Sequence, residues 1–239
     1  MPVSTRDIAL ELDGTPCTGQ LAWNKDSASS RPGILVAHTI RGRTAFEDEK
    51  ARNLAELGYA ALSIDLYGDH TRDDPIDEMR SHMNDLRDDR PGLASRLLSW
   101  HAALKAAPEV RSSRTAAIGF CFGGLCVLDL ARANTDIAGV VSFHGILKPP
   151  AVVADTSATR VLVLHGWDDP LAPPEDVLTL SEELTRLGVD WQLHAYGNTV
   201  HAFTNPQAGD SSAGTVYNPA ADRRSHAAMR DFLAELFVD

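Results

Sequence analysis

Short apolar runs alternate along the chain with longer segments in which apolar residues recur at every third or fourth position. Apolar runs of about four to eight residues bounded by turn residues are typical of buried strands, and the longer period is typical of amphipathic helices. The predicted buried strands are residues 33–38, 59–65, 115–120, 137–144, 160–165 and 191–196. The predicted helical segments are residues 46–57, 77–107, 125–133, 174–187 and 220–237.

The order of these elements predicts the fold class. Residues 8–12 and 20–23 lie on either side of the turn dipeptide Asp13-Gly14, which predicts an opening hairpin. Strands and helices then alternate, and this repetition predicts an α/β fold with a mostly parallel central sheet and helices on both faces. Residues 205–218 are expected to be a polar connection. Because ligands of such sheets bind at the carboxyl ends of the strands, the loops there are where chemistry is expected.

The composition predicts one cytoplasmic domain. A chain of 239 residues with 44% hydrophobic content can bury one large core, so residues 1–239 are expected to form a single domain. A net charge of -11 with scattered Lys and Arg disfavours nucleic-acid binding. The first residues lack a signal-peptide pattern and no apolar run approaches the ~18 residues of a membrane span, so no membrane partner is expected. Three cysteines argue against a disulfide scaffold.

The segment GFCFGG, residues 119–124, has the pattern of a nucleophile elbow. In this motif the nucleophile ends a strand and begins a helix, and glycines beside it permit a turn too tight for a side chain. Cysteine stands where serine is commoner, and a helix N-terminus favours its reactive thiolate form. The alternative is that Cys121 is a small buried hydrophobic residue. That ordinary role is expected for Cys126, inside the following helix, and for Cys17, in a predicted turn.

A cysteine nucleophile needs a base, and elbow enzymes place an acid and then a histidine later in the chain. Asp168 and Asp169 follow the predicted strand 160–165, and His201 follows the strand 191–196. Loops after neighbouring parallel strands can converge on the elbow. The residues alone do not choose between the two aspartates. Asp-Asp-Pro is also ordinary turn chemistry, and a loop histidine is often only solvated.

Several segments together resemble the dienelactone hydrolase family of α/β-hydrolases. The similarity covers nearly the whole chain and is carried by RPGILVAH, GYAALSIDLYG, GFCFGG, HGWDDPLAP, HAFTNP and ADRRSHAAMRDFL. The resemblance implies the compact α/β-hydrolase fold and a Cys-His-Asp triad that hydrolyses lactones or esters. On the family pattern the acid is Asp169 rather than Asp168.

The resemblance also implies a role for each site residue. Cys121 would attack the acyl carbon, His201 would accept and return a proton, and Asp169 would hold the histidine tautomer. The backbone N–H groups of Phe122 and Ile40 would stabilise the oxyanion. No cofactor is implied, and no metal is expected because the nine histidines form no HExxH-type pair.

Two positions depart from the archetype of the family. Thr39 replaces a glutamate that helps to control the thiol, so activation is expected to depend on His201 and the helix N-terminus. Asn205 replaces an arginine that pairs with a substrate carboxylate, which disfavours an anionic substrate. Arg41 and Arg43 flank the predicted oxyanion loop and could replace that cation, although solvated surface arginines are the more ordinary interpretation.

Other residues at strand ends are expected to line or cover a pocket. His144 and His165 end two predicted strands and are expected to form hydrogen bonds within the loops. Residues 69–90 follow a strand end and are either a lid or a solvated helix pair. The predicted pocket residues are Thr39, Arg41, Tyr67, Trp167 and Asn205.

The expected function is a cysteine-dependent hydrolase of small carboxylic esters or lactones. A broad carboxylesterase or thioesterase is the nearest alternative. A thiol-based sensor and a non-catalytic binding protein on the same fold are alternatives from other classes. The expected partner is the small-molecule substrate alone, and the expected assembly is a monomer or homodimer.

Overall fold

The computed structural model describes residues 2–25, 30–133, 135–150 and 156–238. By contact density the chain divides into two compact units, Met1–Ala117 and Ile118–Asp239, each with its own strands and helices. The single domain expected for the whole chain stays a prediction.

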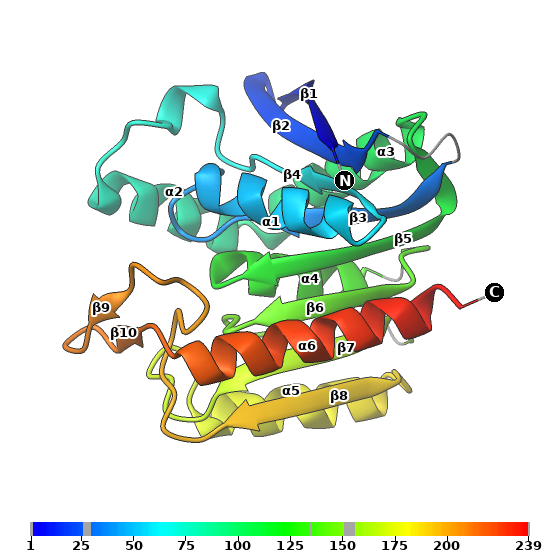
Figure 1. The fold of residues 1–239 in the computed structure, drawn as a ribbon. Helices are drawn as coiled ribbons and strands as arrows, with labels where there is room; N and C mark the ends of the chain where they lie inside the picture. The colour runs from blue at the N-terminus through cyan, green and yellow to red at the C-terminus, as the bar shows by residue number, and fades with distance from the viewer. Residues whose placement is uncertain (1, 26–29, 134, 151–155, 239) are drawn as a thin grey trace. The chain divides into compact units, whose positions relative to one another are not determined.

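The first unit contains four paired strands. They are β1 (Val3–Leu12), β2 (Thr15–Asn24), β3 (Arg31–Ala37) and β4 (Ala60–Ser63), in the spatial order β1-β2-β4-β3 (Figure 1). The predicted hairpin joins β1 to β2 through Asp13 at φ 51° and Gly14 at φ 76°. Two successive positive φ values suit a type I′ turn, whose twist matches that of paired strands. β2 and β4 are antiparallel, whereas β4 and β3 are parallel.

The helices of the first unit are α1 (Ala45–Glu56), the short η1 (Asp69–Thr71), α2 (Ile76–Asp88) and α3 (Arg90–Ala106). The predicted helical segment 77–107 is interrupted because Asp89 leaves the helical conformation. Its side chain caps α3 by accepting a hydrogen bond from the Gly92 N–H at 3.1 Å. Residues 69–90 are mostly helical, and Met79 and Met83 lie on the buried face of α2.

Strand β5 (Val110–Phe120) begins in the first unit and ends in the second. The sequence predicted only its second half, residues 115–120. The first half presents the exposed polar residues Arg111, Ser112 and Ser113, which give no apolar run. Backbone pairing rather than side-chain burial therefore determines where β5 begins.

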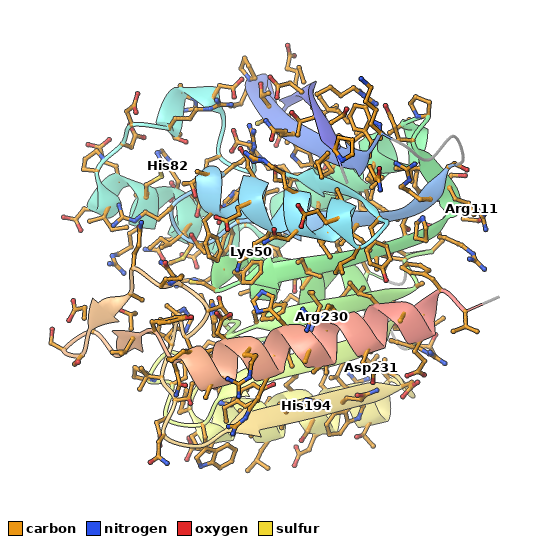
Figure 2. The ribbon with its side chains drawn as sticks, in the orientation of Figure 1. Lys50, His82, Arg111, His194, Arg230 and Asp231 are labelled. Carbon is orange, nitrogen blue, oxygen red and sulfur yellow. The ribbon has the colours of Figure 1, made fainter. Side chains whose placement is uncertain are left out.

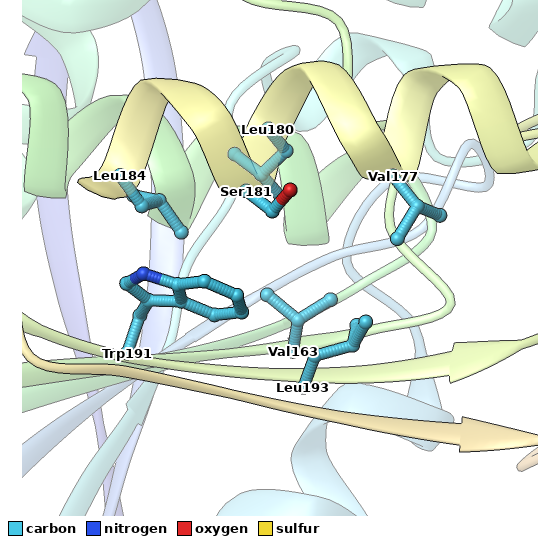
Figure 3. Close-up of a pocket in the computed structure, with 7 residues that line it drawn as sticks. All are labelled: Val163, Val177, Leu180, Ser181, Leu184, Trp191 and Leu193. Carbon is cyan, nitrogen blue, oxygen red and sulfur yellow. The ribbon is translucent and has the colours of Figure 1, made fainter. Parts of the chain in front are cut away.

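The second unit contains the strands β6 (Gly139–Phe143), β7 (Arg160–Gly166) and β8 (Trp191–Tyr196), which pair in parallel in that order. Its helices are α4 (Phe122–Arg132), α5 (Pro174–Arg186) and α6 (Pro219–Leu236). Figure 1 shows α6 in front of β6 and β7, and α4 and α5 behind these strands. A small apolar cavity lies where α5 packs on β7 and β8 (Figure 3), lined by Val163, Val177, Leu180, Ser181, Leu184, Trp191 and Leu193.

The prediction that residues 191–196 form a buried strand is right about the strand and wrong about its burial. β8 is the last strand of the spatial order and pairs with β7 alone among the described strands. Gln192, His194 and Ala195 are exposed, and Figure 2 shows the His194 side chain on β8. An apolar run therefore marks a strand without showing whether it lies at the edge of a sheet.

The connection 205–218 contains a small hairpin that the sequence did not predict. It consists of β9 (Gly209–Asp210) and β10 (Thr215–Val216), drawn in orange in Figure 1. The Asp210 carboxylate closes its loop by accepting the N–H groups of Ser212 and Ala213 at 3.0 and 3.1 Å. Strands of two residues show no periodicity, so only the folded loop reveals them.

The predicted α/β class is confirmed. Eight strands form a mostly parallel sheet, and helices connect most of the successive parallel strands.

Candidate active site

Cys121 lies in the tight turn between β5 and α4. Its φ of 57° and ψ of -114° are rarely adopted by residues other than glycine, and such strain is typical of functional turns. A Cβ on Gly119 would overlap the Gly123 carbonyl, so glycine is required there. The Cys121 N–H donates to the Phe143 carbonyl at 3.1 Å and ties the turn to β6. The turn therefore has the backbone geometry expected of an elbow.

The other two cysteines have different surroundings. Cys126 is fully buried inside α4. Cys17 is also fully buried. It lies in β2 and pairs with Leu10 of β1, so its predicted place in a turn is wrong. Burial, with a further contribution from the Asp65 carboxylate, raises the pKa of the Cys17 thiol to about 12. No disulfide joins these two cysteines or Cys121, all three of which the structure describes.

Asp169 and His201 form a buried ion-pair contact in the second unit. Asp169 lies in the turn after β7, and His201 lies in the loop after β8. His201 Nδ1 and Asp169 Oδ2 are 2.7 Å apart, and their side chains are 3% and 0% exposed. The other carboxylate oxygen of Asp169 accepts the Leu171 N–H at 2.8 Å, which fixes the carboxylate plane. Asp168 points to solvent instead, so only one of the two aspartates reaches the histidine.

The pKa of His201 is raised to about 10. Burial disfavours the charged ring, but Cys121 and Asp169 outweigh burial by their negative charge and hydrogen bonding. His201 Nε2 is nonetheless buried without a hydrogen bond of standard geometry to the described residues. The negative charge of Cys121 therefore acts on His201 without a hydrogen bond of standard geometry, which is common in catalytic pairs before the transition state.

Backbone hydrogen bonds hold the acid loop against the histidine loop. The Trp167 N–H donates to the Tyr196 carbonyl at 2.9 Å, and the Asp168 N–H donates to the Thr199 carbonyl at 3.0 Å. These bonds continue the pairing of β7 with β8 beyond the strand ends. The Asp169–His201 contact therefore rests on a fixed backbone and not on side-chain rotamers alone.

The predicted oxyanion loop after β3 is a tight turn in the first unit. The Gly42 N–H donates to the Thr39 carbonyl at 3.3 Å, and Thr39 Oγ1 accepts the Arg41 N–H at 3.2 Å. The buried carboxylate of Glu47 accepts the Thr39 N–H at 3.1 Å. Within the described ranges the Ile40 N–H donates to no residue. A ligand oxygen would therefore meet an uncommitted donor there.

The two arginines of this loop differ in their availability. Arg43 pairs with both carboxylate oxygens of Asp48, at 2.8 and 3.0 Å, and donates to the Thr18 carbonyl at 3.0 Å. Its side chain is 9% exposed, so its interpretation as a solvated residue is wrong. Arg41 is exposed. Of the two, Arg41 alone keeps a guanidinium without a structural ion pair among the described residues.

The remaining predicted pocket residues are placed unequally. Tyr67 is nearly buried, with its ring edge-on to His38 at 4.5 Å. Trp167 is 44% exposed. Asn205 accepts the Gln207 N–H at 3.0 Å, so its side chain stabilises its own loop. Trp167 is thus the one residue of the predicted set with an exposed aromatic ring.

His144, which the sequence predicted only to form hydrogen bonds within the loops, lies beside His201. The His144 ring lies edge-to-face with the His201 ring at 5.1 Å, and His144 Nε2 pairs with Thr204 Oγ1 at 2.8 Å. The hydrogen bond expected for His165 is absent, since neither ring nitrogen meets a partner in the described part of the chain. Burial lowers the pKa of His165 and favours its neutral form. The sequence feature that could have pointed to these two histidines is their position at the ends of predicted strands.

The described residues contain no group of three or more His, Cys, Asp or Glu side chains arranged to hold a metal ion. No helix among the same residues is long and apolar enough to cross a bilayer.

Comparison with known families gives a match to the dienelactone hydrolase family over residues 19–237. The chain belongs to the dienelactone hydrolase family. The match includes β3, the turn at Cys121 and the loops that carry Asp169 and His201. The protein is therefore a dienelactone hydrolase-like hydrolase, as the motifs predicted.

Individual known proteins resemble this chain over most of its length. A solved dienelactone hydrolase-like promiscuous phosphotriesterase from metagenomic libraries is 38% identical, covers 99% of both chains and superposes with a TM-score of 0.94. "Uncharacterized protein K02A2.1" of Caenorhabditis elegans is 38% identical over 63% of this chain and 98% of its own length. A Yersinia pestis protein named "Putative carboxymethylenebutenolidase" is 27% identical over 72% of this chain and 68% of its own length.

Proposed function

We propose that this dienelactone hydrolase-like protein hydrolyses small carboxylic esters or lactones through a thioester on Cys121. The observation that carries the proposal is the buried 2.7 Å contact between His201 and Asp169, together with the strained turn at Cys121. The influence of Cys121 on the pKa of His201 supports an interaction between the thiol and the imidazole. The hydrogen bond and negative charge of Asp169 also raise the pKa of His201, and an imidazolium beside the thiol favours a thiolate–imidazolium pair at neutral pH.

In the first half-reaction the Cys121 thiolate attacks the acyl carbon, and the carbonyl electrons move to the oxygen. The N–H of Phe122, the first residue of α4, stabilises the oxyanion, with the Ile40 N–H as the second donor on the family pattern. As the tetrahedral intermediate collapses, the bond to the leaving oxygen breaks and His201 Nε2 gives that oxygen a proton. An alcohol and a Cys121 thioester result, and in a lactone the alcohol stays attached to the acyl group.

In the second half-reaction water attacks the thioester while neutral His201 takes its proton. Collapse of this intermediate releases the carboxylic acid and restores the thiolate and the imidazolium. Asp169 keeps the Nδ1–H of His201 engaged, so that Nε2 is the nitrogen that exchanges protons with the substrate. Thr39 cannot act as a base at neutral pH, which leaves His201 in that role.

The lack of an arginine at position 205 favours a neutral substrate over one with a free carboxylate. Asn205 stands where archetypal members carry an arginine, and its side chain is engaged with the Gln207 N–H. Burying a carboxylate without a partner costs several kcal/mol, and the net charge of -11 gives anions no long-range attraction. We therefore expect higher kcat/KM for a neutral ester than for a matched ester with a distal carboxylate. A preference for the carboxylate that disappears in Arg41→Ala would instead assign Arg41 as its anchor.

The test of the function is a hydrolysis screen over p-nitrophenyl esters, enol lactones and acyl thioesters with Cys121→Ala as the control. Turnover of an ester or lactone that Cys121→Ala loses supports the proposal. Turnover that survives this substitution contradicts it. Oxidation of Cys121 by peroxide without any hydrolysis would favour a thiol-based sensor.

A second candidate substrate class is the phosphotriesters. It is favoured by the similarity to the metagenomic phosphotriesterase over 99% of both chains. The same thiolate would attack phosphorus and release an aryloxide, which His201 would protonate. Water would then attack phosphorus while neutral His201 takes its proton, so that the P–S bond breaks, a phosphodiester leaves and the thiolate is restored. Hydrolysis of a p-nitrophenyl phosphotriester by the wild-type protein and its loss in Cys121→Ala would support this activity. No release of p-nitrophenol would contradict it.

A further inference from the structure

We infer that the β9–β10 hairpin is the element that positions the Asp169–His201 pair, and that Gly214 is its positioning residue. The inference rests on the catalytic roles proposed above. It concerns residues 209–216, a surface hairpin that lies in the connection between β8 and α6 (Figure 1).

The hairpin holds the backbone of His201 through two hydrogen bonds. The His201 N–H donates to the Gly214 carbonyl at 3.0 Å, and the Val216 N–H donates to the His201 carbonyl at 3.1 Å. His201 thus forms a parallel bridge with Thr215, although it lies outside any strand. The N–H and the carbonyl of His201 both bond to this one short segment. The position of the His201 imidazole therefore depends on the position of the hairpin.

The same hairpin touches the acid loop at Gly214. A Cβ on Gly214 would lie 2.9 Å from Pro170 Cδ and closer still to Pro170 Cγ. Pro170 directly follows Asp169, and its ring is closed on the backbone, so it cannot rotate away. Gly214 also adopts φ 65°, where a side chain is strained. Gly214 therefore holds the His201 N–H with its carbonyl. Because it has no side chain, it also leaves room for Pro170 of the acid loop.

The surrounding loop leaves the hairpin little freedom. Asp210 closes the hairpin loop, and the Tyr217 N–H donates to the Ala208 carbonyl at 2.9 Å. The Asn218 N–H donates to the Phe203 carbonyl at 3.1 Å. Ala202, directly after His201, is held at a positive φ of 58°. A strained non-glycine conformation persists only where its surroundings enforce it.

A side chain at Gly214 would separate the two loops. Carbon atoms in ordinary contact are about 3.5 to 4.0 Å apart, so either the hairpin or Pro170 must move by roughly 1 Å. The first movement displaces His201 and the second displaces Asp169. A misplacement of about 1 Å in a catalytic group costs about 100-fold in rate.

The experiment is the Gly214→Ala substitution in the full chain, with hydrolysis of p-nitrophenyl acetate measured across pH. We expect kcat to fall about 100-fold with KM changed less than about threefold. The pKa of His201, measured from the pH dependence of kcat/KM and from NMR titration of its ring, should move down toward its ordinary value because the Asp169 contact loosens.

Two glycines of the chain provide matched controls. Gly209 lies in the same hairpin, and a Cβ there meets nothing within 4 Å. Gly188 follows α5 at φ 70° and is equally open, so Gly188→Ala introduces the same backbone strain without the contact. Both control variants should keep the pH profile and kcat of the wild type. A Gly214→Ala variant that also keeps them would overturn the inference.

A compensating change separates positioning from general damage. Pro170→Ala removes the two ring atoms nearest to the added methyl group, so Gly214→Ala/Pro170→Ala should regain most of kcat and the pH profile. If Gly214→Ala does not fold, the double variant carries the test, and its failure to fold or to recover contradicts the inference. A wild-type protein that hydrolyses no ester would remove the proposed function, while NMR titration of His201 in the same variants still tests the hairpin.

Discussion

Two cysteines with little exposed surface have opposite surroundings in this protein. Cys17 is 0% exposed and Cys121 is 8% exposed. Burial raises the pKa of the Cys17 thiol, and the negative charges of Asp65, Asp69 and Asp13 raise it further against the positive charge of Arg96. Cys121 instead begins a helix and interacts with a histidine that an aspartate supports. The difference shows that burial alone does not decide whether a thiol reacts.

The backbone is the origin of this difference. Cys17 follows the regular pairing of β1 with β2, in which alternate side chains point into the interior. Cys121 has a strained conformation that lifts its side chain out of the β5 register. A thiol at that position can meet groups from later loops, which a thiol inside a strand pair cannot.

Removing each thiol gives the largest expected contrast. Cys121→Ala should lower kcat for an ester by about 10⁵-fold or more, because loss of a nucleophile removes the whole covalent route. Cys17→Ala should keep kcat within about twofold, although its stability falls. The measurement is steady-state hydrolysis on the same substrate for both variants. Substantial hydrolysis by Cys121→Ala would show that another group is the nucleophile.

Removing the support of His201 should have the next largest effect. Asp169→Asn should lower kcat by about 10³ to 10⁴-fold because the amide favours the wrong histidine tautomer. Asp168→Asn should be nearly silent because Asp168 is exposed. Both variants are compared by kcat at one pH. The reverse ranking would assign the acid to Asp168.

Alkylation measures the contrast between the thiols directly. With limiting iodoacetamide at pH 7, Cys121 should react at least about 100-fold faster than Cys17, because the pKa of Cys17 near 12 leaves almost no thiolate. Peptide mapping by mass spectrometry gives the rates, and hydrolysis should fall in proportion to labelling at Cys121. Early labelling of Cys17 with activity intact would reverse the comparison.

The smallest expected effect is on stability. Asp169 raises the pKa of His201 through a hydrogen bond and its negative charge, so the folded state holds the His201 proton to higher pH than an unfolded chain, in which the pKa is about 6.5. In a Cys121→Ala background, where no thiol exchanges a proton with the ring, this stabilising contribution is full below pH 6.5 and is lost as pH rises through the raised pKa. The difference in free energy of unfolding between Cys121→Ala and Cys121→Ala/His201→Gln should therefore shrink from pH 6 to pH 10, measured by urea unfolding. The contribution of Cys17 cancels in this difference, and a constant difference would contradict the raised pKa.

The sequence determined the features that depend on neighbouring residues along the chain. The alternation of apolar runs predicted the strands and helices and with them the α/β class. The GFCFGG pattern predicted the turn at Cys121, because glycine is required wherever the backbone passes too close for a side chain. Where the signal was weak, as in the polar first half of β5, the element was found only in part.

The tertiary structure alone decided what depends on close approach between distant loops. Asp168 and Asp169 are chemically identical neighbours, and family similarity rather than local chemistry favoured the one that meets His201. The ion pair of Arg43 and the contact of Gly214 with Pro170 left no trace in local periodicity. The local pattern of apolar residues predicts which side of a helix or strand is buried. Which distant residue that side contacts depends on how the rest of the chain folds back. Shifts of about 1 Å, which sequence patterns do not encode, then decide whether these groups can react.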